Sequence, residues 1–246
     1  CNTLQKSKKF ESMSKRILGI IPARGNSKEF PRKNLANFCG RPLLAWTILA
    51  SRNSKYITTT IVSSDDDEIL KISKDYKAET LKRPEEFAKD NSSSESVVKH
   101  AIDYLALANQ RYDEIILLQP TSPLRTSSDI DNAYELMHNS SANSLVSVCK
   151  GDNKVLKFMK YREDGFIEGI SNNDYPFMSR QDLPEVFKPN GAIYIVNVDL
   201  FNSNQVFFTN KTVSYVMPID RSIDIDSKID LKLAEKEMSL FKKTLI

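Results

Sequence analysis

The sequence is short of the residues that metal centres, disulfide frameworks and membrane spans require. Its three cysteines, Cys1, Cys39 and Cys149, lie too far apart for the paired spacing of a zinc site. An odd number of widely separated cysteines is typical of reduced thiols, which predicts a cytoplasmic location. No run approaches the ~18 apolar residues of a membrane span, so we expect no membrane partner.

A strong excess of one charge sign is also missing. The chain has 35 basic and 32 acidic residues, which gives a formal net charge of +3. Domains that bind nucleic acid usually carry a clear basic excess. The composition therefore predicts no nucleic-acid partner, and any anion site should be local.

Histidine is scarce as well. The chain has two, His100 and His138, and both fall inside helical patterns, so we interpret them as surface residues. No Ser-His-Asp or Cys-His arrangement is indicated.

Short β-branched apolar runs alternate with helical patterns along much of the chain. The runs are ILGIIP at 17, ITTTIVSS at 57, EIILLQP at 114, SLVSVC at 144, GAIYIVNV at 191 and VSYVMP at 213. Helices are expected over 43–54, 66–76, 93–108, from Ser128, and over 229–243, with Asp65 and Ser92 capping the second and third. This alternation predicts an α/β fold with a mostly parallel sheet flanked by helices.

The alternation weakens in two places. Residues 1–15 are polar and predict a disordered lead before a single domain over 16–246, although Cys1 could instead be a lipidated N-terminus. Residues from about 150 to 190 are rich in turn formers, aromatics and cations, which indicates an insertion. Exposed aromatics there are expected at a subunit interface or over a substrate pocket, so we predict a two-fold dimer.

The first apolar run leads into a basic loop, IIPARGNSKEFPRKN, with four cations at Arg24, Lys28, Arg32 and Lys33. In a doubly wound sheet, ligands bind beyond the carboxyl ends of the strands, where this loop would lie. The loop lacks the GK[ST] ending of a Walker motif and the G-x-G-x-x-G of dinucleotide folds. Because Gly25 is its only glycine, side-chain cations would neutralise phosphate here. A solvated basic loop is the alternative.

The stretch RSIDID at 221 carries two carboxylates, Asp224 and Asp226, two residues apart. On a strand these would share one face, while Ile223 and Ile225 would face an apolar layer. Paired carboxylates suit Mg²⁺, which also takes ligands from substrate phosphates. Alternatively, Asp226 could simply cap the last helix.

A third stretch, LLQPTSPLR at 117, is a buried strand that ends at two prolines and Arg125. The prolines fix its exit path and leave Gln119, Thr121 and Ser122 at the carboxyl end of the strand. These polar groups could read a base or a ribose, although a plain turn would explain them equally well.

Five motifs in this order, PARGNSKEFPRKN, RPEEFAKDNSSS, LLQPTSPLR, FKPNGAIYI and SIDID, resemble those of the CMP-sialic acid synthetases, the N-acylneuraminate cytidylyltransferases. The resemblance covers roughly residues 16 to 240. Enzymes that activate legionaminic or pseudaminic acid share the same pattern, so it does not identify the sugar.

The resemblance implies a Rossmann-like nucleotidyltransferase that joins CTP to a nine-carbon 2-keto acid sugar with Mg²⁺, giving the CMP-sugar and pyrophosphate. By motif position, the nucleotide-binding residues would be Arg24, Lys33, Asn34, Arg83, Ser94 and Gln119. The catalytic residues would be Arg24, Lys33, Asp224 and Asp226, of which the two aspartates would hold the metal.

On the sugar side, the residues implied by motif position are Gln119, Lys157, Arg180, Tyr194, Phe207 and Phe208. In this family the inserted segment exchanges between two subunits. The resemblance therefore implies a homodimer, in which Phe207 and Phe208 would reach the sugar site of the partner.

One residue departs from the family pattern, and two rival functions are open. Glu29 stands where relatives often have glycine, and an acid there could disturb the backbone of the loop and its approach to phosphate. A synthetase for 3-deoxy-manno-octulosonate or a sugar phosphate would lack PTSPLR and NGAIYI. A non-catalytic nucleotide-binding homologue would have lost the cations or the aspartates that this chain retains.

Overall fold

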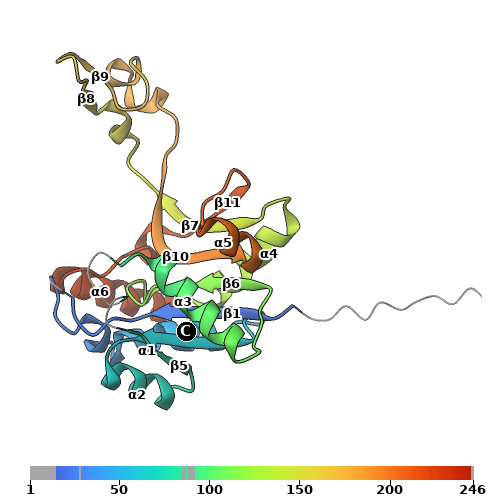
Figure 1. The fold of residues 1–246 in the computed structure, drawn as a ribbon. Coiled ribbons are helices and arrows are strands. Elements are labelled where there is room, and N and C mark those ends of the chain that lie inside the picture. The colour runs from blue at the N-terminus through green and yellow to red at the C-terminus, as the bar shows by residue number, and fades with distance from the viewer. Residues whose placement is uncertain (1–14, 28, 85–86, 88–91, 245–246) are drawn as a thin grey trace, which may run out of the picture.

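A seven-stranded sheet forms the centre of the fold (Figure 1). The computed structural model describes residues 15–27, 29–84, 87 and 92–244. The strands are β1 (Ile17–Pro22), β4 (Thr59–Ser64), β5 (Glu79–Lys82), β6 (Glu114–Leu117), β7 (Ser144–Lys150), β10 (Phe187–Asn197) and β11 (Thr212–Val216), in the order β11-β7-β10-β6-β1-β4-β5. Every neighbouring pair is parallel except the two that involve β10. The prediction of a mostly parallel α/β sheet is therefore confirmed.

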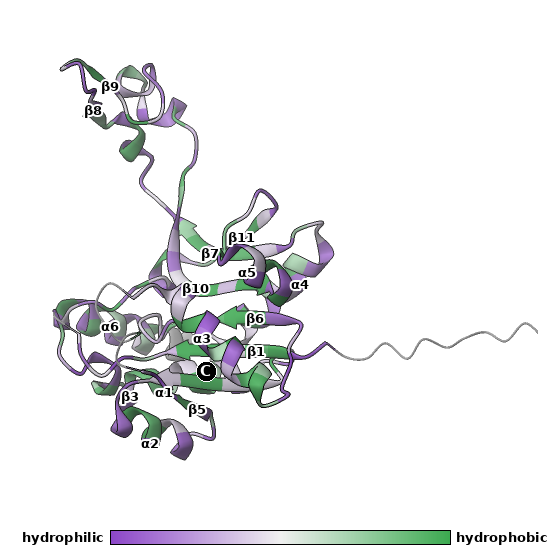
Figure 2. Cartoon of the chain, in the orientation of Figure 1, coloured by the Kyte–Doolittle hydropathy of each residue, from purple (hydrophilic) through white to green (hydrophobic). Residues whose placement is uncertain are grey.

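Helices cover both faces of the sheet because strand side chains alternate between the faces. On β1, Ile17 and Ile21 belong to one core and Leu18 and Ile20 to the other, and all four are buried. The first core lies under α1 (Leu43–Arg52), α2 (Asp67–Asp75) and α4 (Ser127–Asn139), and the second under α3 (Ser94–Leu107) and α5 (Val198–Asn204). Figure 2 shows apolar residues concentrated on the strands between these layers.

A third, smaller core lies beside the main sheet. It packs α6 (Lys228–Thr244) against the hairpin β2 (Asn37–Phe38) and β3 (Arg41–Pro42). Phe38, Ile225 and Met238 are buried in it. This core fixes both the loop after β1 and the segment before α6, which the site uses.

Residues 151–186, called the arm below, leave the sheet after β7 and return at β10. They form the hairpin β8 (Met159–Tyr161) and β9 (Ile167–Gly169) and the short 3-10 helices η3 (Asn153–Lys157), η4 (Tyr175–Phe177) and η5 (Arg180–Asp182). The arm extends well away from the sheet in Figure 1. Its exposed large apolar side chains are Val155, Phe158, Met159, Tyr161, Phe166, Ile167, Ile170 and Phe177.

The expected strand at 221–226 is wrong. The 3-10 helix η6 (Ile219–Arg221) is followed by an extended segment over 222–226 that pairs with no strand of the described sheets. The expected N-terminal lead, apart from Lys15, falls outside the described residues. Across the described helices, none is long and apolar enough to cross a membrane.

Candidate active site

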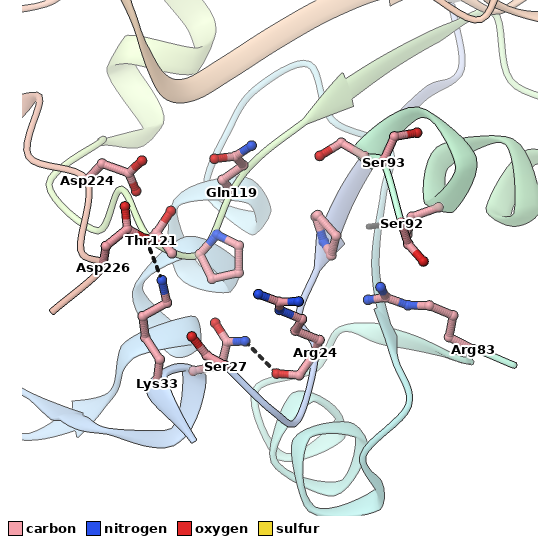
Figure 3. Close-up of a pocket in the computed structure, with 15 residues that line it drawn as sticks. Arg24, Ser27, Lys33, Arg83, Ser92, Ser93, Gln119, Thr121, Asp224 and Asp226 are labelled. Carbon is pink, nitrogen blue, oxygen red and sulfur yellow. Dashed lines mark hydrogen bonds and ion pairs between the residues drawn. The ribbon is translucent and has the colours of Figure 1, made fainter. Parts of the chain in front are cut away.

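A cavity of about 270 Å³ opens at the carboxyl ends of the parallel strands (Figure 3). The loops after β1, β5 and β6, the start of α3 and the segment before α6 contribute its walls. The lining residues are Pro22, Arg24, Ser27, Lys33, Asn34, Arg83, Ser92, Ser93, Ser94, Val97, Gln119, Pro120, Thr121, Asp224 and Asp226.

One side of the cavity is basic. Arg24 follows β1 and Arg83 follows β5, and both guanidinium groups lie at the cavity in Figure 3. Burial lowers the pKa of Arg83, Asp65 opposes this shift, and the charge of Arg24 adds to it. Arg83 is held by hydrogen bonds that it donates to the carbonyl oxygens of Ser63 and Phe87. This side of the cavity is therefore a rigid, positively charged surface that favours an anion.

Two buried polar atoms of the lining residues have no hydrogen-bond partner among the described residues: Arg83 Nε and Asn34 Oδ1. Asn34 Nδ2 is occupied, because it donates to the carbonyl oxygen of Arg24 at 2.8 Å. A buried donor or acceptor without a partner costs about 1–3 kcal/mol, so these atoms favour a polar ligand.

The opposite side of the cavity is acidic. Asp224 and Asp226 are exposed there, while Ile225 between them is fully buried in the third core. Although the Asp224 side chain is exposed to the cavity, the protein atoms around it desolvate its carboxylate and raise its pKa. A hydrogen bond with Thr121 lowers this pKa, and the charge of Asp226 raises it. Lys33 Nζ donates to Asp226 Oδ1 at 2.8 Å. The two carboxylates thus share one side of the cavity, as predicted, although on an extended segment and not on a strand.

The alternative that Asp226 caps the last helix is wrong. Ser227 is the capping residue, because its Oγ accepts hydrogen bonds from the backbone N–H groups of Ile229 and Asp230. The Asp230 carboxylate in turn accepts from the backbone N–H of Ser227 at 2.8 Å and of Asp226 at 3.2 Å. This reciprocal arrangement leaves the carboxylate of Asp226 available to the cavity.

Some cations of the loop after β1 line the cavity, and one forms ion pairs with residues at the start of α2. Arg24 and Lys33 line the cavity, whereas Arg32 forms ion pairs with Asp66 and Glu68 at 3.2 and 2.6 Å. Lys28 lies outside the described residues. The loop is therefore only in part a solvated basic surface.

Gly25 lets the same loop approach α2 closely. A Cβ atom at this position would lie 2.7 Å from Asp66 Oδ2, and the Gly25 N–H donates to Asp65 Oδ1 at 3.0 Å. Glu29 is exposed and is not among the lining residues of the cavity.

The end of β6 supplies the remaining polar groups. Gln119 and Thr121 line the cavity, and the guanidinium of Arg125 is buried behind them. Arg125 Nη1 donates to the carbonyl oxygens of Gln119 at 3.3 Å and Ala192 at 2.9 Å. Burial lowers the pKa of Arg125 to about 10. The strand end forms turns, as one interpretation of the sequence expected, and Arg125 also anchors it to β10.

Gly191 on β10 forms a surface directly behind Gln119. It has a φ of +74°, and a Cβ atom there would lie 2.9 Å from Gln119 Oε1 and 3.7 Å from Asp224 Oδ2. Glycine adopts this backbone readily, and its lack of a Cβ atom leaves room for Gln119.

Residues 18–243 match the family model described as cytidylyltransferase. The chain belongs to the cytidylyltransferase family. It is 34% identical over 222 residues to the N-acylneuraminate cytidylyltransferase of Escherichia coli O18:K1:H7, which covers 90% of this chain and 52% of that relative. This chain therefore spans about half the length of the Escherichia coli relative.

Two other relatives of this cytidylyltransferase match along nearly their whole length. The CMP-N,N'-diacetyllegionaminic acid synthase of Legionella pneumophila is 34% identical, with 94% of this chain and 100% of that relative covered. The pseudaminic acid cytidylyltransferase of Campylobacter jejuni is 31% identical, with 89% and 94% covered. Because relatives named for three different sugars are about equally similar, overall identity does not indicate a sugar.

Among solved structures, CMP:2-keto-3-deoxy-manno-octonic acid synthetase complexed with CTP has a TM-score of 0.68 to this chain at 13% identity. The match covers 92% of this chain and 99% of that chain. At this identity the likeness shows the fold alone, which agrees with the predicted Rossmann-like fold.

This cavity brings together the eight residues that motif position assigned to the nucleotide and the metal. They are Arg24, Lys33, Asn34, Arg83, Ser94, Gln119, Asp224 and Asp226. Thr121, one of the polar groups expected at the end of its strand, lines the cavity too. Ser27, Ser92 and Ser93 also line it and were not assigned to it, although all three lie inside the recognised motifs.

Apart from Gln119, the residues expected on the sugar side do not line this cavity. Lys157 and Arg180 are in the arm, where Arg180 pairs with Asp152 at 3.5 Å. Tyr194 is half-buried on β10 and packs against Phe207, with ring centroids 5.7 Å apart. Phe207 is itself buried in the second core, whereas Phe208 is 75% exposed. Of the two phenylalanines, only Phe208 is therefore presented on the surface.

Proposed function

We propose that this chain transfers CMP from CTP to the anomeric hydroxyl of a nonulosonic acid, giving the CMP-sugar and pyrophosphate. The observation that carries the proposal is the cavity at the carboxyl edge of the sheet, with cations on one side and two carboxylates on the other. The named activities of relatives at 31–34% identity support the same reaction class.

In this proposal the basic side holds the nucleotide. Arg24, Lys33 and Arg83 neutralise the triphosphate, and the buried Asn34 Oδ1 and Arg83 Nε receive polar groups of the nucleotide. Ser94 and Gln119 complete the nucleotide pocket. Recognition of a pyrimidine by such fixed polar groups predicts a preference for CTP over ATP and GTP.

Magnesium fits the acidic side. Asp224 and Asp226 offer oxygen ligands within the cavity, and the charge of Asp226 raises the pKa of Asp224, an effect that a cation between them would offset. Among the described residues no group of three or more His, Cys, Asp and Glu side chains could hold a metal, so phosphate oxygens and water would supply the other ligands. When bound, the ion would offset negative charge on the triphosphate.

The reaction then depends on positioning and charge. The sugar hydroxyl oxygen attacks the α-phosphorus as the bond to the pyrophosphate oxygen breaks and the hydroxyl proton is released. Arg24 lies where it can stabilise the departing pyrophosphate, and Lys33, which pairs with Asp226, would do so beside the two carboxylates.

We further propose a homodimer formed through the arm. Its exposed side chains include Phe158, Tyr161, Phe166 and Phe177, an apolar surface of the kind that a subunit interface covers. Lys157 and Arg180 lie in the arm outside their own chain's cavity and would face a sugar bound by the partner chain, with Phe208 at the same site. Tyr194 would face the sugar from β10. Sedimentation at micromolar concentration checks this, since a monomer with full activity contradicts it.

The reduced thiols expected for this chain and its use of CTP favour a cytoplasmic location.

One assay tests the reaction. The protein is incubated with CTP and Mg²⁺ together with N-acetylneuraminic, legionaminic, pseudaminic or 3-deoxy-manno-octulosonic acid, and pyrophosphate release is measured. We expect release with one of the nonulosonic acids and much less with ATP or GTP in place of CTP. Release with the eight-carbon acid alone, or no release with any acid despite CTP binding, would overturn the proposal.

A further inference from the structure

The segment that carries Asp224 and Asp226 has no strand partner in the described sheets, so other contacts must hold it in place. The Ile225 N–H donates to the carbonyl oxygen of Thr121 at 2.8 Å, which ties the segment to the loop after β6. Ser222, at the start of the segment, receives a hydrogen bond from Asn190 Nδ2 at 3.0 Å. Asn190 is buried, on β10, and does not line the cavity.

Asn190 lies where β10 departs from regular pairing. Pro189 pairs with Val148, but the next paired residue, Tyr194, is opposite Val146, so the residues between them bulge out of the ladder. Asn190 Oδ1 accepts from Ser147 Oγ at 2.6 Å and from the Ala192 N–H at 3.2 Å. The amide side chain therefore has a fixed orientation, with its N–H group directed to Ser222.

The same residue also contacts the other side of the site. Its carbonyl oxygen accepts from Ser122 Oγ at 3.2 Å, and Gly191 next to it lies directly behind Gln119. Asn190 is thus bonded to both the loop that carries Gln119 and the segment that carries the two aspartates.

We propose that Asn190 is a positioning residue for the transfer reaction, which sets the Asp224–Asp226 segment relative to Gln119 without touching substrate. The inference rests on the proposed function. Arg24 and Arg83 follow other strands and are held by other bonds, so loss of Asn190 should leave nucleotide binding nearly intact while the carboxylates move.

The test is the Asn190→Ala variant, with Asn197→Ala as its control. Asn197 is at the other end of β10, where its Oδ1 accepts from two backbone N–H groups at the start of α5. For Asn190→Ala we expect a fall in kcat of about 10²-fold, because displacement of reacting groups by about 1 Å has that effect. We expect KM for CTP, and CTP binding measured without sugar, to change less than about threefold. Asn197→Ala should lose thermal stability and keep its kcat.

A milder pair of variants decides the question if Asn190→Ala does not fold. Ser222 and Ser203 each donate to the carbonyl oxygen four residues earlier, but only Ser222 also accepts from Asn190. Ser222→Ala should lower kcat about tenfold and Ser203→Ala should not.

The outcomes separate the two proposals. Wild-type protein that releases no pyrophosphate defeats the proposed function and this inference with it. An active wild type whose folded Asn190→Ala or Ser222→Ala variant keeps its kcat, or loses activity only through KM for CTP, defeats the inference alone.

Discussion

Replacing Gly191 by alanine should clearly reduce kcat/KM for CTP while it lowers the melting temperature by only a few degrees. The new Cβ atom would lie 2.9 Å from Gln119 Oε1, which is closer than such atoms approach in proteins. The oxygen is the far end of a flexible side chain, so it can move away at little cost in folding free energy. Gln119 lines the cavity, however, and its displacement alters the nucleotide pocket.

The effect on stability can be separated from this contact. Gly191 has a φ of +74°, and a left-handed backbone costs alanine about 1–2 kcal/mol. For a chain of this length, each kcal/mol lowers the melting temperature by about 2–4 °C, so we expect a decrease of about 2–8 °C.

Gly40 provides a matched control. Its φ of +86° gives alanine the same backbone strain, but no atom lies within 4 Å of the position that the added methyl carbon would take. Gly40→Ala should therefore lose similar thermal stability and keep wild-type turnover. Gly191→Ala should lose on the order of tenfold in kcat/KM for CTP, measured by pyrophosphate release.

The comparison of the two variants would refute the reasoning in either of two ways. Equal values of kcat/KM for CTP in Gly191→Ala and Gly40→Ala would mean that the contact with Gln119 has no role in the reaction. A much larger stability loss in Gly191→Ala than in Gly40→Ala would mean that Gln119 cannot move as we infer.

Three further predictions use other parts of the site. Ser227→Ala should lower the free energy of unfolding by about 1 kcal/mol, because Ser227 caps α6. Asp226→Asn should keep the melting temperature and lose on the order of 10²-fold in turnover. Equal losses of stability in the two variants would contradict the assignment of Ser227 as the cap. Burial raises the pKa of Asp129, but hydrogen bonds, first those from Arg221, lower this pKa overall. The ionised Asp129 therefore stabilises the folded protein at pH values above its pKa in the unfolded chain, about 3.9. This stabilisation is lost as the pH falls through the pKa in the folded protein. The melting-temperature difference between wild type and Asp129→Asn should therefore be largest near neutral pH and shrink below about pH 4. Arg32→Ala should keep pyrophosphate release within about twofold of wild type, because its ion pairs are on the exposed surface of α2.

The strands and helices were predictable because their apolar residues follow clear periods, but the helix caps were less so. The sequence pattern favours Asp65 and Ser92 as the caps of α2 and α3, whereas Asp66 and Ser93 cap these helices. At both helices two adjacent residues can cap, and the three-residue spacing to the following glutamate favours the first of them, whereas the second caps in the structure. Tertiary contact decides at α2, because Asp65 Oδ1 accepts from the Gly25 N–H.

The site was predictable where it depends on parallel strands, since topology brings their carboxyl ends together. The burial of Phe207 was not predictable from the sequence, because two adjacent aromatic residues in a loop show no hydrophobic periodicity that indicates which ring is buried. Phe207 packs against Phe201 at 5.1 Å and belongs to the core, whereas Phe208 is exposed. The alternation of polar and apolar residues in RSIDID correctly predicted that Asp224 and Asp226 lie on the same side. It also suggested a strand, because the same alternation occurs in an extended segment that pairs with no other strand.

The segment 222–226, which carries the two carboxylates of the cavity, depends on hydrogen bonds to other elements for its position. β11 is at the edge of the sheet, three strand positions from β6, a distance of about 14 Å. Residues 217–226 could extend to about 33 Å, roughly twice what is needed. The 3-10 helix η6 takes up part of the excess, but chain length alone leaves the position of Asp224 undetermined. The hydrogen bonds of Ser222 to Asn190 and of Ile225 to Thr121 remove that freedom, so the carboxylates are located by contacts with β10 and with the loop after β6, the same two elements that hold Gln119.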